Sequence, residues 1–356
     1  MSDLGEFGLI GRISAAVSVP RGVTGIGDDC AIIPQKQGLD TLVTTDLLIE
    51  GRHFIMEDIG AYRLGWKSAA VNISDIAAMG GKPAAAFLSI ALPKGLAESC
   101  ASGGDNALWI DGFIRGFSDL CDRYGVALLG GDTSASPSEL FINVTVLGEC
   151  PHGAALRRCD ARPGDIIYVS GPLGDAGTGL RLILERAGRD THGVGTTGVT
   201  PEDILIRRHY MPEPRVELGL ALRDTPGVHA MMDISDGIAS DLRHILEESS
   251  ARSTKDYSSK TTAPGCHSRP DRESLSAEID LQAIPMSEEM RSVCAERGWD
   301  AAELAVGGGE DYELLFTAAP GAQVPEGCVA IGRVTEGPGG IKWIGSDRDY
   351  QGFTHF

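Results

Sequence analysis

Aspartates that follow apolar runs or lie in small-residue turns are the part of this sequence best suited to chemistry. They occur in five short motifs: Gly27-Asp28-Asp29, Thr44-Thr45-Asp46, Asn72-Ile73-Ser74-Asp75, Gly130-Gly131-Asp132-Thr133 and Asp233-Ile234-Ser235-Asp236. A buried carboxylate is costly unless it is paired or bound to a cation. Carboxylate oxygens are also the ligands that hard divalent cations prefer. The repeated pattern therefore predicts a shared cation site, with a polyphosphate as the ligand of the cation.

Each motif also has a purely structural interpretation. Asp28-Asp29 follows a glycine-rich segment and fits an Asx turn, although adjacent carboxylates repel each other and favour a cation. Gly130-Gly131 is either an ordinary bend or a place where backbone N–H groups approach phosphate oxygens. Residues 233–237 could cap the helix expected from residue 238. Asp75 is the hardest to explain structurally, because Asp is unfavourable inside a helix.

A second acidic motif, residues 307–314, places a glycine run and several acids directly before an apolar strand. It is either a loop with a strand start or a substrate clamp. His53 and Lys67 carry no signal individually. The sequence has no phosphate-binding P-loop, no dinucleotide-binding glycine motif, no protein-kinase signature and no nucleophile elbow. Any use of a nucleotide must therefore depend on a different architecture.

Composition limits the classes of protein to consider. With 356 residues, 42% of them hydrophobic, the chain can form one large or two medium domains. A net charge of -19 disfavours nucleic acid and anionic membranes as partners. No signal peptide and no apolar stretch of about 20 residues is present, so we expect a cytoplasmic protein with no membrane partner. The eight scattered cysteines are expected to be reduced thiols.

The expected elements alternate between strands and helices, which predicts an α/β (α+β) fold. In the first half they are a strand at 40–45 that ends at Asp46, a helix at 62–79, a strand at 85–92, a helix at 109–124, a short strand at 126–129 and a strand at 141–147. In the second half they are a strand at 166–170, a helix ending at 184, a strand at 229–232, a helix at 238–246 and a strand at 314–316. Pro and Gly residues between 150 and 164 interrupt this pattern, which predicts two α/β domains, 1–150 and 151–356.

Two polar segments differ from the rest of the chain. Residues 249–276 are rich in Ser, Thr, Lys and Arg and contain almost no large apolar side chains, which predicts a disordered surface insertion. Residues 189–200 are rich in Gly and Thr and are expected to form a similar loop. Neither segment is expected to carry chemistry.

Taken in order, the motifs resemble the thiamine-monophosphate kinase family, within the aminoimidazole-ribonucleotide-synthetase-like ATP-binding superfamily. The resemblance extends from Gly5-Glu6-Phe7 to the terminal Gly352-Phe353-Thr354-His355-Phe356. Its most specific parts are the run at 72–80, the segment Gly309-Glu310-Asp311-Tyr312-Glu313-Leu314 and the His-Phe terminus. The segment at 249–276 has no counterpart in the family pattern.

The resemblance implies ATP-dependent phosphorylation of thiamine monophosphate to thiamine diphosphate with several Mg²⁺ ions. It implies that domain 1–150 binds ATP and Mg²⁺ and that its sheet contributes to a barrel across a homodimer. The implied metal ligands are Asp28, Asp29, Thr44, Thr45, Asp46, Asp75, Asp132, Asp233 and Asp236. The implied ATP contacts are Gly131, Asp132, Arg158 and Ser235. The implied contacts of the thiamine phosphate are His53, Glu310 and Phe353.

The chemistry of this reaction fits the absence of an obvious catalytic base. A phosphate monoester is largely dianionic at neutral pH, with a second pKa of about 6, and can attack the γ-phosphorus of ATP in line without a general base. We therefore expect no catalytic acid or base. Two alternatives stay open. One is another ATP-using member of the superfamily with a different acceptor. A selenide-dependent dikinase is disfavoured among these, because the sequence lacks a reactive Cys in a glycine-rich N-terminal segment. The other is a nonenzymatic protein that binds divalent cations or nucleotides.

Overall fold

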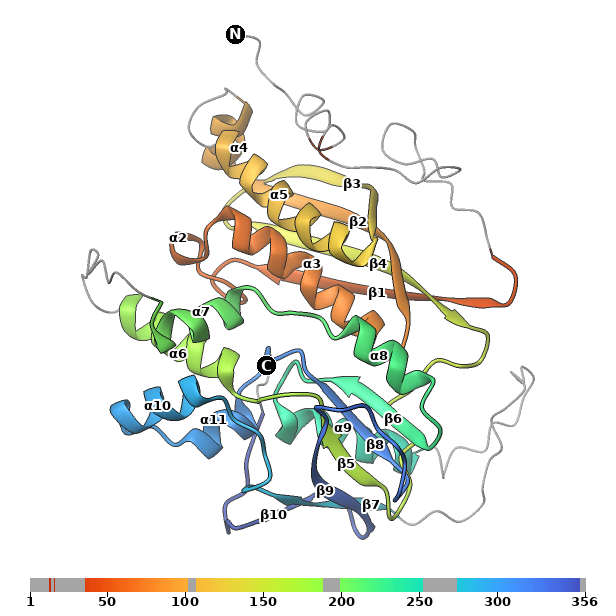
Figure 1. The fold of residues 1–356 in the computed structure, drawn as a ribbon. Coiled ribbons are helices and arrows are strands. Elements are labelled where there is room, and N and C mark those ends of the chain that lie inside the picture. Colours follow the sequence, from red (N-terminus) through yellow and green to blue (C-terminus); the bar gives the residue numbers. More distant parts are fainter. Residues whose placement is uncertain are drawn as a thin grey trace. The chain divides into compact units, whose positions relative to one another are not determined.

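The computed structural model describes residues 13, 16, 36–101, 107–187, 199–251 and 274–352 (Figure 1). Contacts divide the chain into two compact units. The first comprises Met1–Ile76 and Gly81–His152, and the second comprises Ala77–Gly80 and Gly153–Phe356. Each unit combines helices with one sheet, which confirms the expected α/β fold class. No helix among the described residues has both the length and the apolar character needed to cross a membrane.

The first unit contains a four-stranded sheet in the order β1-β4-β2-β3. β2 and β3 are parallel, whereas β4 is antiparallel to both β1 and β2. The strands are β1 (Leu39–Ile49), β2 (Lys82–Pro93), β3 (Ala127–Ser136) and β4 (Phe141–Pro151). The helices are α2 (Met56–Ile59), α3 (Ala61–Ala78), α4 (Lys94–Ala101) and α5 (Ala107–Tyr124).

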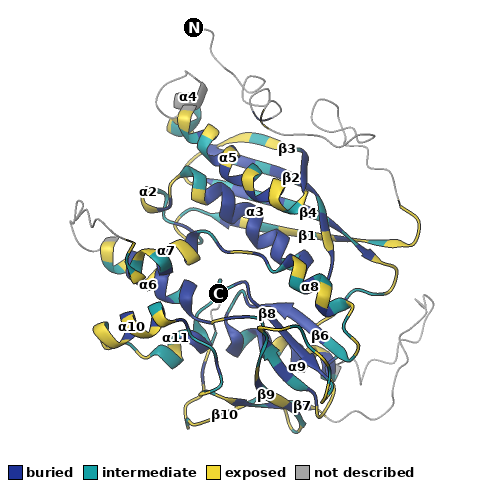
Figure 2. Ribbon diagram, viewed as in Figure 1, coloured by how far each residue is buried: buried dark blue, intermediate teal, exposed yellow. Residues whose placement is uncertain are grey.

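Helices α3 and α5 cover one face of this sheet, and their buried sides face it (Figures 1 and 2). Side chains alternate between the two faces of a strand, so the even-numbered residues of β4 are buried beneath these helices. The two helices approach closely at glycines. A Cβ on Gly65 would lie 1.9 Å from Phe113 O, and a Cβ on Gly116 would lie 1.9 Å from Tyr62 O. The opposite face of the sheet is more exposed, and β1 presents Val43 and Leu47 there.

The second unit contains a six-stranded sheet in the order β10-β7-β9-β5-β8-β6. β10 and β7 are parallel, and the other neighbours are antiparallel. The strands are β5 (Ile166–Val169), β6 (Val228–Asp233), β7 (Leu275–Asp280), β8 (Leu314–Ala318), β9 (Val329–Glu336) and β10 (Ile341–Ile344). The helices are α6 (Asp175–Ala187), α7 (Pro201–Tyr210), α8 (Val216–Arg223), α9 (Ile238–Ala251), α10 (Glu288–Arg297) and α11 (Ala301–Gly307).

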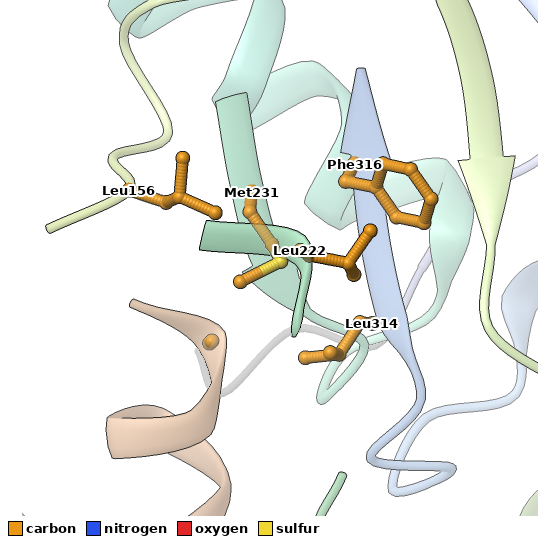
Figure 3. Packing of buried hydrophobic residues seen from close by; sticks show 6 residues of the cluster. Leu156, Leu222, Met231, Leu314 and Phe316 are labelled. Atoms are coloured by element: carbon orange, nitrogen blue, oxygen red, sulfur yellow. The ribbon is translucent and has the colours of Figure 1, made fainter. Parts of the chain in front are cut away.

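An apolar cluster in the second unit holds β6 and β8 in place beneath α8 (Figure 3). Leu222 of α8 packs with Met231 of β6 and with Leu314 and Phe316 of β8, and all four side chains are buried. Tyr168 of β5 stacks on Phe316 with 5.2 Å between ring centroids. One acidic motif begins at the end of β6, and the other ends at the start of β8. This packing therefore fixes the strand ends next to which both motifs lie.

Two expectations about strand ends are wrong. β1 does not stop at Asp46 but continues to Ile49, and β3 does not end at Leu129 but continues through the Gly130-Gly131 pair to Ser136, with a register shift directly before the pair. The reason in β3 is close packing rather than a turn. A Cβ on Gly131 would lie 1.7 Å from Leu88 O of β2, so only glycine allows the two strands to pair at this point.

The expected insertion at 249–276 is wrong at both ends. α9 continues to Ala251 and β7 begins at Leu275. Of this segment, residues 252–273 lie outside the described structure. Ser249 is fully buried, and its Oγ donates to Arg158 O at 3.2 Å. Ser250 Oγ accepts a hydrogen bond from Leu275 N at 2.9 Å. Serine can therefore be buried here because its hydroxyl finds partners.

The second polar segment is only partly described. Residues 189–198 of the expected 189–200 loop lie outside the described residues. Thr200 is the N-cap of α7, where its side chain and that of Asp203 form a capping box. The end of this segment thus has a defined role in starting a helix.

Candidate active site

Two carboxylates and a hydroxyl meet in the first unit where β1 faces α3. Thr44 and Asp46 lie on the same face of β1 as the buried Leu42 and Leu48. Thr44 Oγ1 donates a hydrogen bond to Asp75 Oδ2 of α3. Burial, and then the negative charge of Asp75, raise the pKa of Asp46 to about 6. Such a pair of carboxylates is stabilised most directly by a cation.

The donor set of this pair fits Mg²⁺. Among the described residues, no group of three or more His, Cys, Asp or Glu side chains is placed to hold a metal ion. Mg²⁺ does not need such a cage, because proteins usually bind it through one or two carboxylates while water and substrate phosphates fill the other positions. Asp46 and Asp75 would supply those carboxylates. Asp28 and Asp29 lie outside the described residues.

Thr45 has a different environment from its neighbours on β1. Its side chain lies on the opposite face of the strand from Thr44 and Asp46. Thr45 Oγ1 accepts hydrogen bonds from Asn143 Nδ2 and from Thr145 Oγ1, each at 3.1 Å. The structure therefore does not bring the Thr45 hydroxyl to Asp46 and Asp75.

Gly131 and Asp132 lie on β3, at the other edge of the sheet from β1. Asp132 pairs with Ser89 of β2, which pairs with Asn143 of β4, and this row of residues belongs to the more exposed face. Three strand spacings separate the two edges, a distance of about 14 Å. Within one chain, Asp132 is therefore not brought together with Asp46 and Asp75.

His53 follows β1 in a turn that fixes its imidazole. Nδ1 accepts a hydrogen bond from Ile49 N at 3.0 Å, which assigns the ring proton to Nε2. The fully buried Lys67 places its Nζ 3.4 Å from His53 O and so holds the turn from the side of α3. The geometry thus makes His53 an Nε2–H donor, and it gives Lys67 a role that its sequence context did not indicate.

In the second unit, Asp233 is the last residue of β6, and Ser235 and Asp236 lie in the loop that joins β6 to α9. A further acid, Asp241, is buried beneath this loop, and its Oδ2 accepts a hydrogen bond from Asp236 N at 3.2 Å. Burial, followed by the charges of Asp233 and Asp236, raises the pKa of Asp241 to about 8. Asp241 was not among the expected residues, although a third acid shortly after Asp236 was a visible signal.

The loop that carries Glu310 is joined to the Ser235 loop by backbone hydrogen bonds. Glu310 N donates to Ser235 O at 2.8 Å, and Tyr312 N donates to Ile234 O at 2.9 Å. Glu310 and Tyr312 have positive φ angles of 63° and 51°, a conformation that non-glycine residues seldom adopt. The structure therefore brings an expected acceptor-binding residue next to an expected ATP-binding residue, and it does so with strained backbone.

Buried acids anchor the same loop from the other side. Asp311 accepts hydrogen bonds from Gly174 N at 2.6 Å and Ala176 N at 3.1 Å, at the start of α6. Burial is the main reason that the pKa of Asp311 lies well above its usual value. Glu313 is bound through both carboxylate oxygens by Arg215. Arg215 had no signal in the sequence, because its partner lies 98 residues away.

The last two expected residues differ in how they are placed. The Arg158 side chain is exposed, while the main-chain oxygen of Arg158 is held by Ser249 Oγ. No described contact relates Arg158 to Ser235. Phe353 lies outside the described residues, so its expected role stays a prediction.

Comparison with known proteins relates this arrangement to a family of kinases. The chain is 36% identical to the thiamine-monophosphate kinase of Escherichia coli (strain K12), with 99% of this chain and 98% of the relative covered. The chain belongs to the thiamine-monophosphate kinase family. Residues 27–150 also match the family described as AIR synthase related protein, N-terminal domain.

Solved structures agree with the family. A thiamine-monophosphate kinase from Stenotrophomonas maltophilia K279a is 35% identical and superposes with a TM-score of 0.76, with 97% of this chain and 98% of that chain covered. A structure of AaThiL complexed with AMPPCP and TMP is 31% identical, with a TM-score of 0.72 and coverage of 99% and 97%. The family therefore accounts for the whole chain rather than for one of its units.

Proposed function

We propose that this protein phosphorylates thiamine monophosphate with ATP and Mg²⁺, and that it forms thiamine diphosphate and ADP. The observation that carries this proposal is the pairing of Asp46 with Asp75, supported by the Thr44 hydroxyl, in a member of the thiamine-monophosphate kinase family. A solved relative in complex with AMPPCP and TMP supports both the nucleotide and the acceptor.

The proposed reaction is direct transfer. A phosphate oxygen of thiamine monophosphate attacks the γ-phosphorus of ATP in line, and the β-phosphate of ADP leaves with the electron pair of the broken bond. The attacking phosphate is already ionised at neutral pH, so no side chain has to remove a proton. Bound Mg²⁺ would supply neutralisation and alignment of the two anionic groups. Asp46 and Asp75 hold the ion, and Thr44 orients the Asp75 carboxylate.

Further side chains of both units take part in this proposal. The additional metal ligands are Asp28, Asp29, Thr45, Asp132, Asp233 and Asp236, and Thr45 would act through its main-chain oxygen because its hydroxyl is on the other face. Gly131, Arg158 and Ser235 contact ATP. His53, Glu310 and Phe353 contact the acceptor. An Nε2–H donor at His53 suits a phosphate oxygen or ring nitrogen, and a carboxylate at Glu310 suits the cationic and amino groups of thiamine.

We also propose that the enzyme is cytoplasmic and that it is a homodimer. Strands β1 and β3 are the two edges of the first unit's sheet, and exposed edges invite pairing with another chain. The face of β1 that the helices do not cover is partly apolar, with Val43 65% exposed and Leu47 49% exposed. Closing two such sheets into one barrel would bury this face and remove the edges.

A product-resolved assay tests the function. Purified protein, ATP and Mg²⁺ are incubated with either thiamine monophosphate or free thiamine, and the thiamine species are separated by chromatography. We expect thiamine diphosphate from the monophosphate only, with one ADP formed per product molecule. Binding of ATP with no thiamine diphosphate would overturn the proposal and would favour a different acceptor or a binding protein.

A further inference from the structure

His209 of α7 reaches the loop that carries Glu310, although nothing in its sequence context suggests chemistry. Its side chain is 3% exposed, and its Nδ1 lies 3.2 Å from Glu310 Oε2. The contact has the distance of an ion pair without the alignment of a hydrogen bond. Contacts of this kind are often loose in a ligand-free enzyme and tighten when the substrate binds.

The backbone of the Glu310 loop is already fixed by other groups. Ser235 O holds Glu310 N on one side, and the N-terminus of α6 holds the Asp311 carboxylate on the other. These bonds determine where the Glu310 main chain lies, but they do not act on its side chain. His209 contacts the Glu310 carboxylate itself.

The position of His209 is itself fixed by packing. The ring of Tyr210 lies 5.0 Å from the imidazole centroid. Helices α6 and α7 approach at Gly179, where an added Cβ would lie 2.3 Å from Leu205 O and 3.1 Å from His209 Cβ. The imidazole is therefore held rigidly, with Nδ1 facing a carboxylate that is 25% exposed.

We propose that His209 is a positioning residue that holds the Glu310 carboxylate in the orientation needed to bind the acceptor substrate. The inference rests on the proposed function, in which Glu310 contacts thiamine monophosphate. His209 acts on one carboxylate oxygen and leaves the other to accept an N–H group or to face the positive ring of the acceptor. It therefore affects binding of the acceptor and not binding of ATP.

The test uses a matched set of substitutions in the full-length protein. Leu and Asn have similar size and shape, and the Asn amide nitrogen can occupy the place of imidazole Nδ1. His209→Leu is expected to raise the KM for thiamine monophosphate about tenfold or more, the usual effect of losing a hydrogen bond to a charged group. The KM for ATP is expected to stay within twofold. His209→Asn is expected to recover most of the loss.

His229 provides the control. It is a second histidine in the same unit, partly buried with its side chain 11% exposed, and its Nδ1 lies 2.9 Å from Asp165 Oδ1. Thr317 Oγ1 and Arg162 N also donate to that carboxylate, so the pair has a structural role away from the Glu310 loop. His229→Leu is expected to lower thermal stability and to leave both KM values unchanged.

A double-mutant cycle decides whether His209 acts through Glu310. Adding His209→Leu to Glu310→Gln is expected to cause less than a twofold further change, because the group being positioned is already lost. Additive effects, equal KM values for the Leu and Asn variants, or an unchanged KM in His209→Leu would each overturn the inference. If His209→Leu does not fold, His209→Gln replaces it in the test. Its side chain is one methylene longer than that of Asn, so its amide donor is displaced from the position of Nδ1. His209→Gln must then raise the KM for thiamine monophosphate, whereas His209→Asn must not. A wild-type protein that forms no thiamine diphosphate would instead reject the proposed function.

Discussion

The hydroxyl of Thr44 donates a hydrogen bond to the carboxylate of Asp75, which ties β1 to α3 at the candidate metal site. The bond uses the one proton of the hydroxyl and leaves the lone pairs of the Thr44 oxygen as possible ligands for a cation. Thr44 therefore has two connected roles, because it orients Asp75 and adds a neutral donor beside two acids.

The neighbouring threonines allow a direct comparison of the two faces of β1. Thr44→Val should weaken Mg²⁺ binding about tenfold to a hundredfold, since it removes the group that orients a carboxylate ligand. Thr45→Val changes the same atoms on the opposite face and should weaken Mg²⁺ binding at least fivefold less than Thr44→Val does. Calorimetry of Mg²⁺ binding in the presence of ATP measures both. Equal losses would show that the hydroxyl of Thr45 also acts at the site.

Asp75 itself is expected to be indispensable. Asp75→Asn keeps the shape of the side chain but removes the charge that holds the cation, so turnover should fall at least a hundredfold. The circular dichroism spectrum and melting temperature should stay close to those of the wild type. Turnover is measured across a range of Mg²⁺ concentrations, and near-normal activity at saturating Mg²⁺ would remove Asp75 from the site.

Asp46 should make the metal-free protein less stable as the pH rises. Its pKa is about 6 in the folded protein and 3.8 in the unfolded reference, so the folded state binds more protons between these values. The free energy of unfolding therefore falls from about pH 4 to pH 6 and stays low above that, by roughly 3 kcal/mol. Urea titrations without Mg²⁺ at pH 4.5 and pH 7 should measure about 2 kcal/mol of this change, because part of it already occurs below pH 4.5.

Asp46→Asn is the control for this pH dependence. It removes the titrating group, so the wild type should become less stable than the variant at pH 7 and approach it at pH 4.5. Added Mg²⁺ should raise the free energy of unfolding of the wild type at pH 7 and have little effect on that of the variant. If the wild type and the variant had equal free energies of unfolding at both pH values, burial and the charge of Asp75 would not raise the pKa of Asp46.

Part of the site could be predicted from the sequence. Asp75 in the last turn of α3 and three polar groups at the end of β6 and just after it pointed to chemistry because local rules did not explain them. The separation of Thr44 from Thr45 also follows from the alternation of side chains along a strand. Once β1 is known to run past Asp46, Thr44 and Asp46 must share a face that Thr45 does not.

Other features could not be predicted because they depend on pairing between distant segments. The place of Asp132 at the far edge of the sheet follows from the strand order, which no local pattern specifies. His209 meets Glu310 across about a hundred residues, and Arg215 meets Glu313 across a similar span. Ser249 was assigned to a polar insertion because composition does not reveal that its hydroxyl is buried against Arg158.

The proposed dimer predicts the effect of charge on the uncovered sheet face. Leu47→Asp would place a carboxylate inside the barrel, where it has no partner, and should convert the dimer to monomers. Leu108→Asp is the control, because Leu108 on α5 is 72% exposed and lies outside the sheet. Light scattering during gel filtration measures the mass of each variant. A wild type with the mass of one chain and full activity would reject the dimer.

The described ends of the polar segment predict which deletion the fold accepts. Ser250 Oγ and Leu275 N are 2.9 Å apart, so a short Gly-Ser linker can replace residues 252–273 without moving α9 or β7. This variant should keep kcat and both KM values within about twofold of the wild type, measured by the thiamine diphosphate assay.

Deletion of 249–276 is the informative contrast. It removes the buried Ser249, whose hydroxyl holds the main chain at Arg158 and Ala161, together with the start of β7. Each lost bond to a buried backbone group costs about 1–3 kcal/mol. We expect this longer deletion to lower the melting temperature strongly and to weaken ATP binding, because Arg158 is no longer held. A shorter deletion that abolishes turnover would instead show that residues 252–273 contribute to the reaction.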